Sequence, residues 1–336
     1  MHEEEKMMKS RAFGRFVAVV ALAGMALNAA AADKPDWLKG PLTKPLDQVR
    51  LGITVLYPES NSYQARYAET VRTYTKKLGV QATIMDPQGD PSKQFSQIQN
   101  LIAEHVDAMV VWPTSAVAVN PAIRRAHAAG IPVIISNSHI DKSARQYTVG
   151  FTGPDDCGQA RKAGEMMVHA LDGKGQIVLV LGTPGYATAM IRESCFMDVI
   201  KKHPDIKVLD KQPANWNRGK AQSVMEAYLT KYGQKIDGVY AEDDGMGLGV
   251  LNAIKGAGIK KGRIKLVTAN MFSQGYTAIK QGWETGSVWQ SPSDDAKLAI
   301  QTAIRVAEGE SVPKVQHIPT PKVNAETIKN FSQPTW

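Results

Sequence analysis

The sequence predicts an α/β fold with two doubly wound parallel sheets. Short apolar segments alternate with longer segments of helical periodicity from residue 51 to residue 308. The apolar segments are nearly continuous, which is typical of parallel strands that are covered on both faces. About ten strands are too many for one ordinary sheet. Two sheets of five or six strands each therefore fit the 336 residues better.

The expected elements follow one another in strand–helix order. Strands are expected at 51–56, 82–85, 108–112, 131–135, 147–150, 177–181, 206–209, 239–241, 264–268 and 287–289. Helices are expected at 63–78, 91–105, 119–129, 156–171, 187–202, 218–232, 246–257, 273–281 and 294–308. Gly79 and Gly130 stand directly after two of these helices, as helix-ending glycines do. Strands joined in this way are expected to have right-handed crossovers.

The composition indicates an ordinary globular chain. Hydrophobic residues make up 43% and charged residues 21%, which excludes a disordered or collagen-like chain. Two cysteines are too few for a disulfide-rich scaffold. The formal net charge of +8 comes without an arginine-rich cluster, so we expect no nucleic-acid partner.

The N-terminus is typical of a secretory signal. Lys9, Arg11 and Arg15 precede an apolar stretch at 17–27, and small residues follow it. We expect a signal peptide over 1–32, cleavage near Ala30–Ala32 and a periplasmic mature chain, with 33–46 as a tether. A membrane anchor that stays uncut is the alternative. Export would place Cys157 and Cys195 in an oxidising compartment, where they could form one disulfide or remain two buried thiols.

The residues that follow the expected strands suggest a ligand site. Ligands of doubly wound sheets bind at the carboxyl ends of the strands. Side chains at these positions are Tyr57, Asn61, Tyr63, Trp112, Asn137, Ser138, the loop 183–186 with Arg192, Trp216, Asp243, Asn270, Trp289 and Gln290. Flat aromatic rings beside amides, carboxylates and an arginine suit a polyhydroxylated ligand, because each buried hydroxyl needs a partner. Trp112 and Trp289 could each be either core or ligand wall.

Signals of catalysis are weak. No H-E-x-x-H spacing, phosphate loop or G-x-S-x-G elbow is present. Gly245, Gly247 and Gly249 open a helix, but Asp243 and Asp244 precede them where a phosphate would sit. We therefore expect no enzymatic activity, no cofactor and no metal.

From about residue 48 to 330, the chain resembles the type I periplasmic binding proteins of sugar ABC transporters, nearest the ribose-binding branch. The segments that carry the resemblance are Leu51–Tyr63, Lys77-Leu78-Gly79-Val80, Asp90-Pro91-Ser92-Lys93-Gln94, Trp112-Pro113-Thr114, Gly130-Ile131-Pro132-Val133-Ile134, Ala163-Gly164-Glu165 and Asp243–Gly249. The resemblance implies two lobes joined by a three-strand hinge, one over 47–152 plus 291–320 and the other over 153–290 plus 321–336. It also implies closure around the ligand.

The resemblance implies roles for individual residues. Asn61, Tyr63, Arg192, Trp216 and Gln290 stand at positions where the family contacts its ligand. The departures from the ribose-binding branch are Gln64, Trp112, Asn137-Ser138 in place of an Asp-Arg pair, Asp243 and Asn270. These departures point away from ribose itself and leave a different pentose, a linear polyol or another small hydroxylated metabolite open.

The function that follows is capture of a small sugar or polyol and its delivery to an ABC-type permease. A monomer and a possible chemoreceptor partner are expected. One alternative is a binding protein for a non-sugar hydroxylated metabolite. Another is the effector core of a LacI-type repressor, which lacks support because no helix-turn-helix precedes residue 48.

Overall fold

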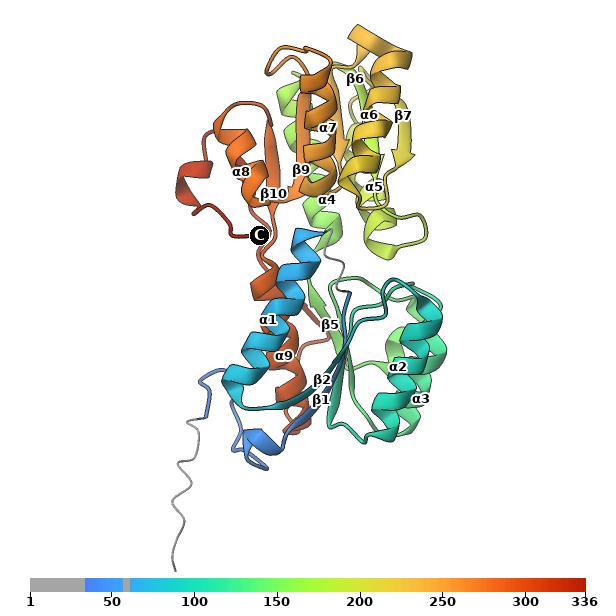
Figure 1. The fold of residues 1–336 in the computed structure, drawn as a ribbon, viewed down its shortest axis with the longest axis vertical. Helices are drawn as coiled ribbons and strands as arrows, with labels where there is room; N and C mark the ends of the chain where they lie inside the picture. Colours follow the sequence, from blue (N-terminus) through green and yellow to red (C-terminus); the bar gives the residue numbers. More distant parts are fainter. Residues whose placement is uncertain (1–33, 57–60) are drawn as a thin grey trace, which may run out of the picture. The chain divides into compact units, whose positions relative to one another are not determined.

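Two six-stranded sheets organise the chain in the computed structural model, which describes residues 34–56 and 61–336 (Figure 1). The first sheet has the order β11-β5-β4-β3-β1-β2 and the second the order β12-β10-β9-β8-β6-β7. The strands of the first sheet are β1 (Arg50–Thr54), β2 (Gln81–Met85), β3 (Ala108–Val111), β4 (Val133–Ser136), β5 (Gly150–Gly153) and β11 (Val315–His317). Those of the second are β6 (Gly175–Leu181), β7 (Ile206–Pro213), β8 (Gly238–Ala241), β9 (Lys265–Asn270), β10 (Gly286–Trp289) and β12 (Lys322–Asn324). β12 pairs antiparallel with β10, and the other described pairings are parallel.

Helices cover both faces of each sheet. On the first sheet, α1 (Ser62–Leu78) and α9 (Pro292–Ala307) pack together on one face, and α2 (Pro91–Ala103) and α3 (Asn120–Ala128) on the other. On the second sheet, α4 (Asp156–Ala170) and α5 (Ala187–Ile200) cover one face. The opposite face carries α6 (Arg218–Tyr232), α7 (Asp244–Gly256) and α8 (Ser273–Lys280). The prediction of two doubly wound sheets is confirmed.

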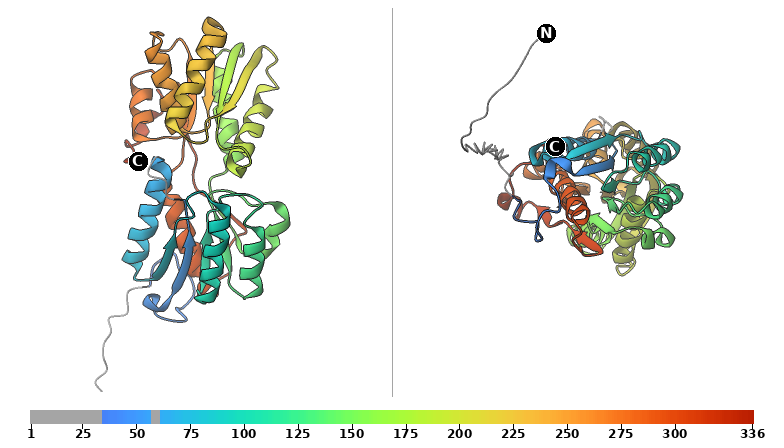
Figure 2. Two further views of the ribbon diagram at one scale, coloured as in Figure 1. Left: turned by 45° about the vertical axis from the view of Figure 1, so that its right-hand side comes forward. Right: turned by 90° about the horizontal axis from the view of Figure 1, so that it is seen from below.

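The chain passes between the sheets three times. It crosses between β5 and α4, between β10 and α9, and between β11 and β12. The left view of Figure 2 shows one sheet above the other with these segments between them. This is the three-strand connection that the resemblance implied.

One expected strand is wrong in position. Residues 142–147 form a 3-10 helix, and β5 begins only at Gly150. Tyr147 packs against the core around α3, where its ring lies 5.4 Å from that of His127. Gly150 lies so close to the chain before β11 that an added Cβ would stand 2.7 Å from the carbonyl oxygen of Lys314. Tertiary packing therefore places this strand three residues later than the apolar pattern suggests.

The N-terminal part of the described chain lies against α9. Leu38 is buried, and the backbone N–H groups of Lys39 and Gly40 donate to the Glu310 carboxylate. The expected signal peptide and its cleavage site lie outside the described residues. Across the described part of the chain, none of the helices combines the length and the apolar character that crossing a bilayer requires.

Candidate ligand-binding cleft

A small cavity lies where the carboxyl ends of the two sheets face each other. Its lining comes from both sheets and consists of Asn61, Tyr63, Gln64, Trp112, Asn137, Tyr186, Thr188, Arg192, Trp216, Asp243, Asn270 and Gln290. The volume accessible to water is about 30 Å³, which is room for roughly two or three water molecules. A larger ligand must therefore displace direct contacts between the two walls.

Two of the lining residues are also helix caps. Asn61 accepts hydrogen bonds from the backbone N–H groups of Tyr63 and Gln64 and begins α1. Asp243 accepts from the N–H of Met246 and begins α7. The amide of Asn61 also donates to Asp243 across the cleft, over 3.4 Å. Capping thus places one amide and one carboxylate opposite each other.

Three lining residues have left-handed backbone conformations. Asn137 has a φ of 63°, Trp216 of 58° and Asn270 of 83°. This region is costly for residues other than glycine and is concentrated at functional sites. Each residue follows or ends a strand, so the turn directs its side chain into the cleft.

Arg192 is the centre of the polar network. Its side chain is 2% exposed and its Nε donates to Asp156 Oδ1 over 3.0 Å. Nη1 donates to the carbonyl oxygen of Glu242, and Nη2 to Asn270 Oδ1 and Gln290 Oε1, over 2.6, 3.2 and 2.9 Å respectively. The guanidinium is thus held by side chains from α4, β9 and the end of β10.

The charges of this network are buried. Burial raises the pKa of Asp156, although Arg192 opposes the shift. Burial alone would lower the pKa of Arg192, but Asp156 and Glu242 raise it overall. A buried charge needs a partner, so Asp156 and Arg192 depend on each other.

A second network lies under the wall from the first sheet. Tyr63 Oη donates to Asp295 Oδ2 over 2.7 Å, and Asn137 Nδ2 donates to the same oxygen over 2.6 Å. Gln290 Nε2 donates to Tyr63 Oη over 2.7 Å and so joins the two networks. Burial raises the pKa of Asp295 to about 7, even though the hydrogen bonds from Asn137 and Tyr63 lower it.

Aromatic rings form the apolar walls. The ring of Trp112 lies edge-on to Tyr63 and Tyr67, with centroids 6.2 and 4.8 Å apart. On the opposite wall, Trp216 lies against Gly182, where an added Cβ would be 2.1 Å from the indole. Tyr186 lies between, with its ring centroid 6.1 Å from that of Trp216. These rings can pack against the C–H faces of a ligand while the amides and charges bind its polar groups.

The structure brings ten of the twelve proposed ligand residues to the cavity wall. They are Asn61, Tyr63, Gln64, Trp112, Asn137, Arg192, Trp216, Asp243, Asn270 and Gln290. Tyr57 lies outside the described residues. Ser138 is the exception: it does not line the cavity but is buried against α5, where its Oγ accepts a hydrogen bond from the hydroxyl of Thr188 over 3.2 Å. Trp289 packs instead against Phe331 and Trp336.

Two further residues, Tyr186 and Thr188, line the cavity. Tyr186 belongs to the loop 183–186 after β6, which is among the candidate positions predicted from the sequence, whereas Thr188 had no sequence signal. Thr188 lies in the first turn of α5, one turn before Arg192. Their place in the wall depends on the angle of α5 against the sheet, which the sequence pattern does not specify.

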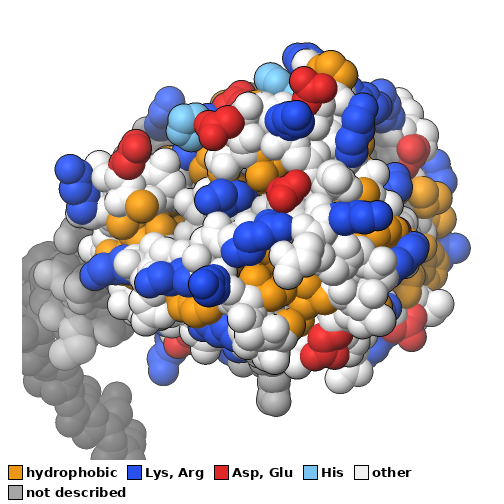
Figure 3. Space-filling model, turned by 90° about the horizontal axis from the view of Figure 1, so that it is seen from above, with side chains coloured by type: hydrophobic (Ala, Val, Ile, Leu, Met, Phe, Trp, Pro, Cys, Tyr) orange, Lys and Arg blue, Asp and Glu red, His pale blue; other side chains and the backbone are white. Residues whose placement is uncertain are grey.

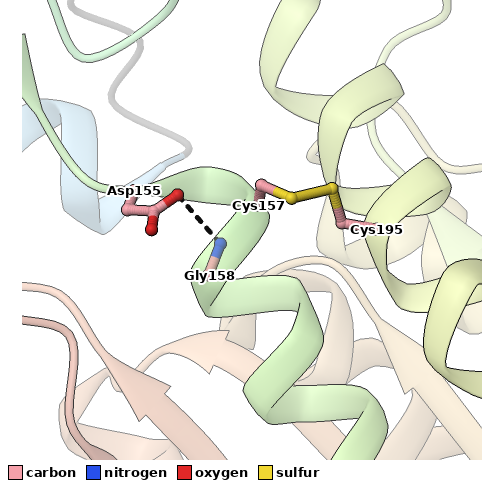
Figure 4. The surroundings of a disulfide bond; sticks show 4 residues. All are labelled: Asp155, Cys157, Gly158 and Cys195. Atoms are coloured by element: carbon pink, nitrogen blue, oxygen red, sulfur yellow. Dashed lines mark hydrogen bonds between the residues drawn. A yellow bond between two sulfur atoms is a disulfide. The ribbon is translucent and has the colours of Figure 1, made fainter.

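The structure joins Cys157 and Cys195 in a disulfide between α4 and α5 (Figure 4). Cys157 lies beside Asp156 in the first turn of α4, a turn capped by Asp155, which accepts from the N–H of Gly158 over 2.9 Å. Cys195 is three residues after Arg192 on α5. The disulfide thus links the two helices that carry the buried ion pair.

The glycines after Asp243 serve helix packing. An added Cβ at Gly249 would stand 2.1 Å from the carbonyl oxygen of Arg218 at the start of α6, and one at Gly247 would stand 2.4 Å from the Thr268 methyl group. Close packing of α7 on α6 and on β9 requires both glycines. Across residues 34–56 and 61–336, no three His, Cys, Asp or Glu side chains are grouped as metal ligands would be.

Comparisons with known proteins all find similarity to binding proteins. A family model described as a periplasmic binding protein domain matches residues 53–311. A xylitol-binding protein of Mycolicibacterium smegmatis is 32% identical over 79% of this chain and 74% of that protein. The ribose import binding protein of Bacillus subtilis is 30% identical over 90% of this chain and 95% of its own length. The crystal structure of a galactofuranose binding protein matches with a TM-score of 0.79 at 26% identity, over 84% of this chain and 96% of that one.

Proposed function

We propose a function from the premise that this chain belongs to the periplasmic binding protein family, whose members are substrate-binding transport proteins rather than enzymes. The protein captures a small sugar or polyol between its lobes and delivers it to an ABC-type permease. The observation that carries the proposal is the position of Arg192. Its side chain lines the same cavity as the aromatic side chains of Trp112 and Trp216. Charge-assisted hydrogen bonds from an arginine are strong and directional, which suits vicinal hydroxyl oxygens.

The two lobes proposed are 47–152 plus 291–320 and 153–290 plus 321–336. The ten residues of the cavity wall would form the ligand site, with Tyr186 and Thr188 added to them. Ligand binding would replace the direct contacts of Asn61 with Asp243 and of Gln290 with Tyr63. A ligand that bridges both walls stabilises the closed form through its differential affinity for that form.

The side chains that line the cavity indicate the chemical class of the ligand. The cavity offers one arginine, several amides and one carboxylate, but no Asp-Arg pair at positions 137 and 138. The relatives are named for xylitol, ribose and galactofuranose. A pentose, a furanose sugar or a linear polyol of similar size is therefore the proposed ligand. The mature protein would be a periplasmic monomer released by cleavage near Ala30–Ala32, with a chemoreceptor as a possible second partner.

A thermal-shift screen of residues 33–336 against xylitol, other linear polyols, pentoses and hexoses tests this proposal. A ligand at 100 times its dissociation constant adds about 2.7 kcal/mol of stability, which raises Tm by a few degrees. The matched control is the double variant Arg192→Gln/Asp156→Asn, which removes both charges together. A response in the wild type that the control lacks supports the proposal. No response to any hydroxylated compound, with a non-sugar metabolite found by native mass spectrometry, would contradict it.

A further inference from the structure

The end of the second sheet that points away from the cleft is strongly basic. Five segments lead from a helix into β6, β7, β8, β9 and β10, namely 171–175, 200–207, 233–238, 255–265 and 280–286. Because these five strands are parallel, all five segments lie at the amino end of the sheet. Figure 3 looks onto this end of the molecule and shows many more blue than red side chains. We refer to these segments together as the basic end.

The basic end holds most of the net charge of the protein. Its segments contain eleven Lys and Arg and four Asp and Glu, a net charge of +7, while the whole chain has +8. The corresponding segments of the first sheet, 44–51, 76–82, 102–109, 127–134 and 146–151, contain four basic and three acidic residues. The charge is therefore concentrated on one end of one sheet, although the two sheets have the same architecture.

The basic side chains are exposed and mostly unpaired. Ten of the eleven are exposed, and the exception is Lys265. Within the described residues, Arg263 alone among them forms an ion pair, over 3.4 Å with Asp237. Glu284 is buried and contacts Thr268, so it does not offset the surface charge. Repulsion between unpaired like charges makes such a surface attractive to an anionic partner.

A hollow between the ends of α6 and α7 adds an apolar component. It has a volume of about 490 Å³ and includes the aliphatic side chains of Leu229, Ile236, Ile259 and Ile264. Lys260 and Arg263 also line it. Aliphatic and cationic groups in one hollow suit an amphiphile that combines a phosphate with hydrocarbon.

The type of residue argues for a lipid surface over an acidic protein. Ten of the eleven cations are lysines, which are mobile point charges, and arginine is the residue suited to fixed bidentate contacts. They come from five loops spread over the end of the sheet and do not form a single groove. A laterally mobile array of phosphates accommodates such a distribution, and lysines near an anionic membrane surface each add to the attraction.

We propose that the basic end binds anionic phospholipid membranes by electrostatic attraction. The contact would hold the protein at a membrane surface with its cleft at the opposite end of the second sheet, so that ligand could still enter. This interaction does not depend on the identity of the ligand. Its strength would depend on salt, because the Debye length shrinks from about 10 Å at 0.1 M to about 3 Å at 1 M ionic strength.

The test is cosedimentation of residues 33–336 with two kinds of vesicle, pure phosphatidylcholine and phosphatidylcholine with phosphatidylglycerol. We expect binding only to the anionic vesicles at 0.1 M salt and its loss at 1 M. The variant Lys201→Gln/Lys202→Gln/Lys260→Gln/Lys261→Gln should bind at least about tenfold more weakly. All four side chains are exposed and far from the cavity wall, so the fold and any sugar-induced thermal shift should be unchanged.

The matched control is Lys76→Gln/Lys77→Gln/Lys314→Gln/Lys329→Gln, which removes four exposed lysines elsewhere and has the same net charge. It should keep most of the binding. Equal losses in the two variants would show that net charge alone is responsible and would overturn the assignment to this end. Absence of wild-type binding to anionic vesicles at 0.1 M salt would also overturn the proposal. That is the result expected if the partner of the basic end is an acidic protein.

Discussion

Trp112 and Tyr186 meet across the cleft, where the indole N–H of Trp112 donates a hydrogen bond to the phenol oxygen of Tyr186. Trp112 follows β3 of the first sheet, and Tyr186 stands at the start of α5 beside the second. Both side chains are buried. The contact therefore links the two sheets directly.

Tyr186→Phe should weaken ligand binding. The variant keeps the ring and removes the hydrogen bond, which is worth about 0.5–1.5 kcal/mol. A smaller closed fraction lowers the apparent affinity in proportion, so we expect a loss of about 2- to 10-fold by titration calorimetry. Tyr228→Phe is the control, because its hydroxyl donates to the Leu179 carbonyl away from the cavity. Identical affinities for the two variants would show that the cross-cleft bond contributes nothing.

Removal of Arg192 should cost both affinity and stability. Arg192→Gln leaves Asp156 buried without a cation, which typically costs about 3–5 kcal/mol. The double variant Arg192→Gln/Asp156→Asn should recover much of that stability and still bind ligand at least about 100-fold more weakly. Urea unfolding and calorimetry separate the two effects. Wild-type affinity in the stable double variant would remove Arg192 from the ligand site.

Gly182→Ala should displace the indole of Trp216. An added Cβ would lie 2.1 Å from that ring, so the ring must move out of its place in the wall. We expect ligand affinity to fall by about an order of magnitude, with a shift in the tryptophan fluorescence. Gly256→Ala on α7 is the control, since nothing lies within 4 Å of its added Cβ. A Gly182→Ala protein with unchanged affinity would place Trp216 outside the binding surface.

The disulfide should support both the fold and the ion pair. Cys157 and Cys195 are 38 residues apart, and a loop of this length corresponds to about 4 kcal/mol in the chain-entropy description. Cys157→Ser/Cys195→Ser should lower Tm and weaken ligand binding through looser packing of α4 on α5. Non-reducing peptide mapping should recover the two cysteines as one linked pair in natively exported protein. Free thiols there would contradict the bond.

Stability of the ligand-free protein should fall as pH rises from about 4 to about 7. Burial raises the pKa of Asp295 to about 7 and that of Asp243 to about 6, above the values of an unfolded chain. The folded state therefore holds protons that the unfolded state has released, and stability declines until the pH exceeds the folded-state values. Asp295→Asn should flatten this dependence in thermal melts at pH 5 and pH 7.5. Equal slopes in the variant and the wild type would show that Asp295 does not titrate in this range.

Much of the site could be predicted because a parallel sheet imposes it. Trp112 and Asn137 follow neighbouring strands of the first sheet, so their loops must meet at the carboxyl edge of that sheet. Asn270 and Gln290 end or follow neighbouring strands of the second sheet and meet at its carboxyl edge in the same way. Periodicity alone placed the helices to within a few residues. Asn61 and Asp243 could be placed by the same strand-end rule, because each follows a strand along the chain, β1 and β8 respectively.

Other features have no local signal. Asp156 and Asp295 accept hydrogen bonds from side chains of the cavity wall and so hold them in place. Their partners are more than thirty residues away in sequence. β11 and β12 are three-residue strands whose pairing depends on sheets that are already formed. Ser138 is buried against Thr188 of α5 and does not line the cavity, and this contact joins residues that are 50 positions apart in sequence.

The sequence by itself determined the fold class and the edge of each sheet where a ligand would bind, because these follow from periodicity and from the order of the strands. It also indicated the family, through the resemblance of short segments that stand in the family's order. The tertiary structure decided which side chains face one another, how far apart the walls stand and which charges are buried together. Those outcomes depend on the angles at which α4, α5 and α9 pack on their sheets. Such angles are fixed by contacts between residues distant in sequence, and no local pattern encodes them.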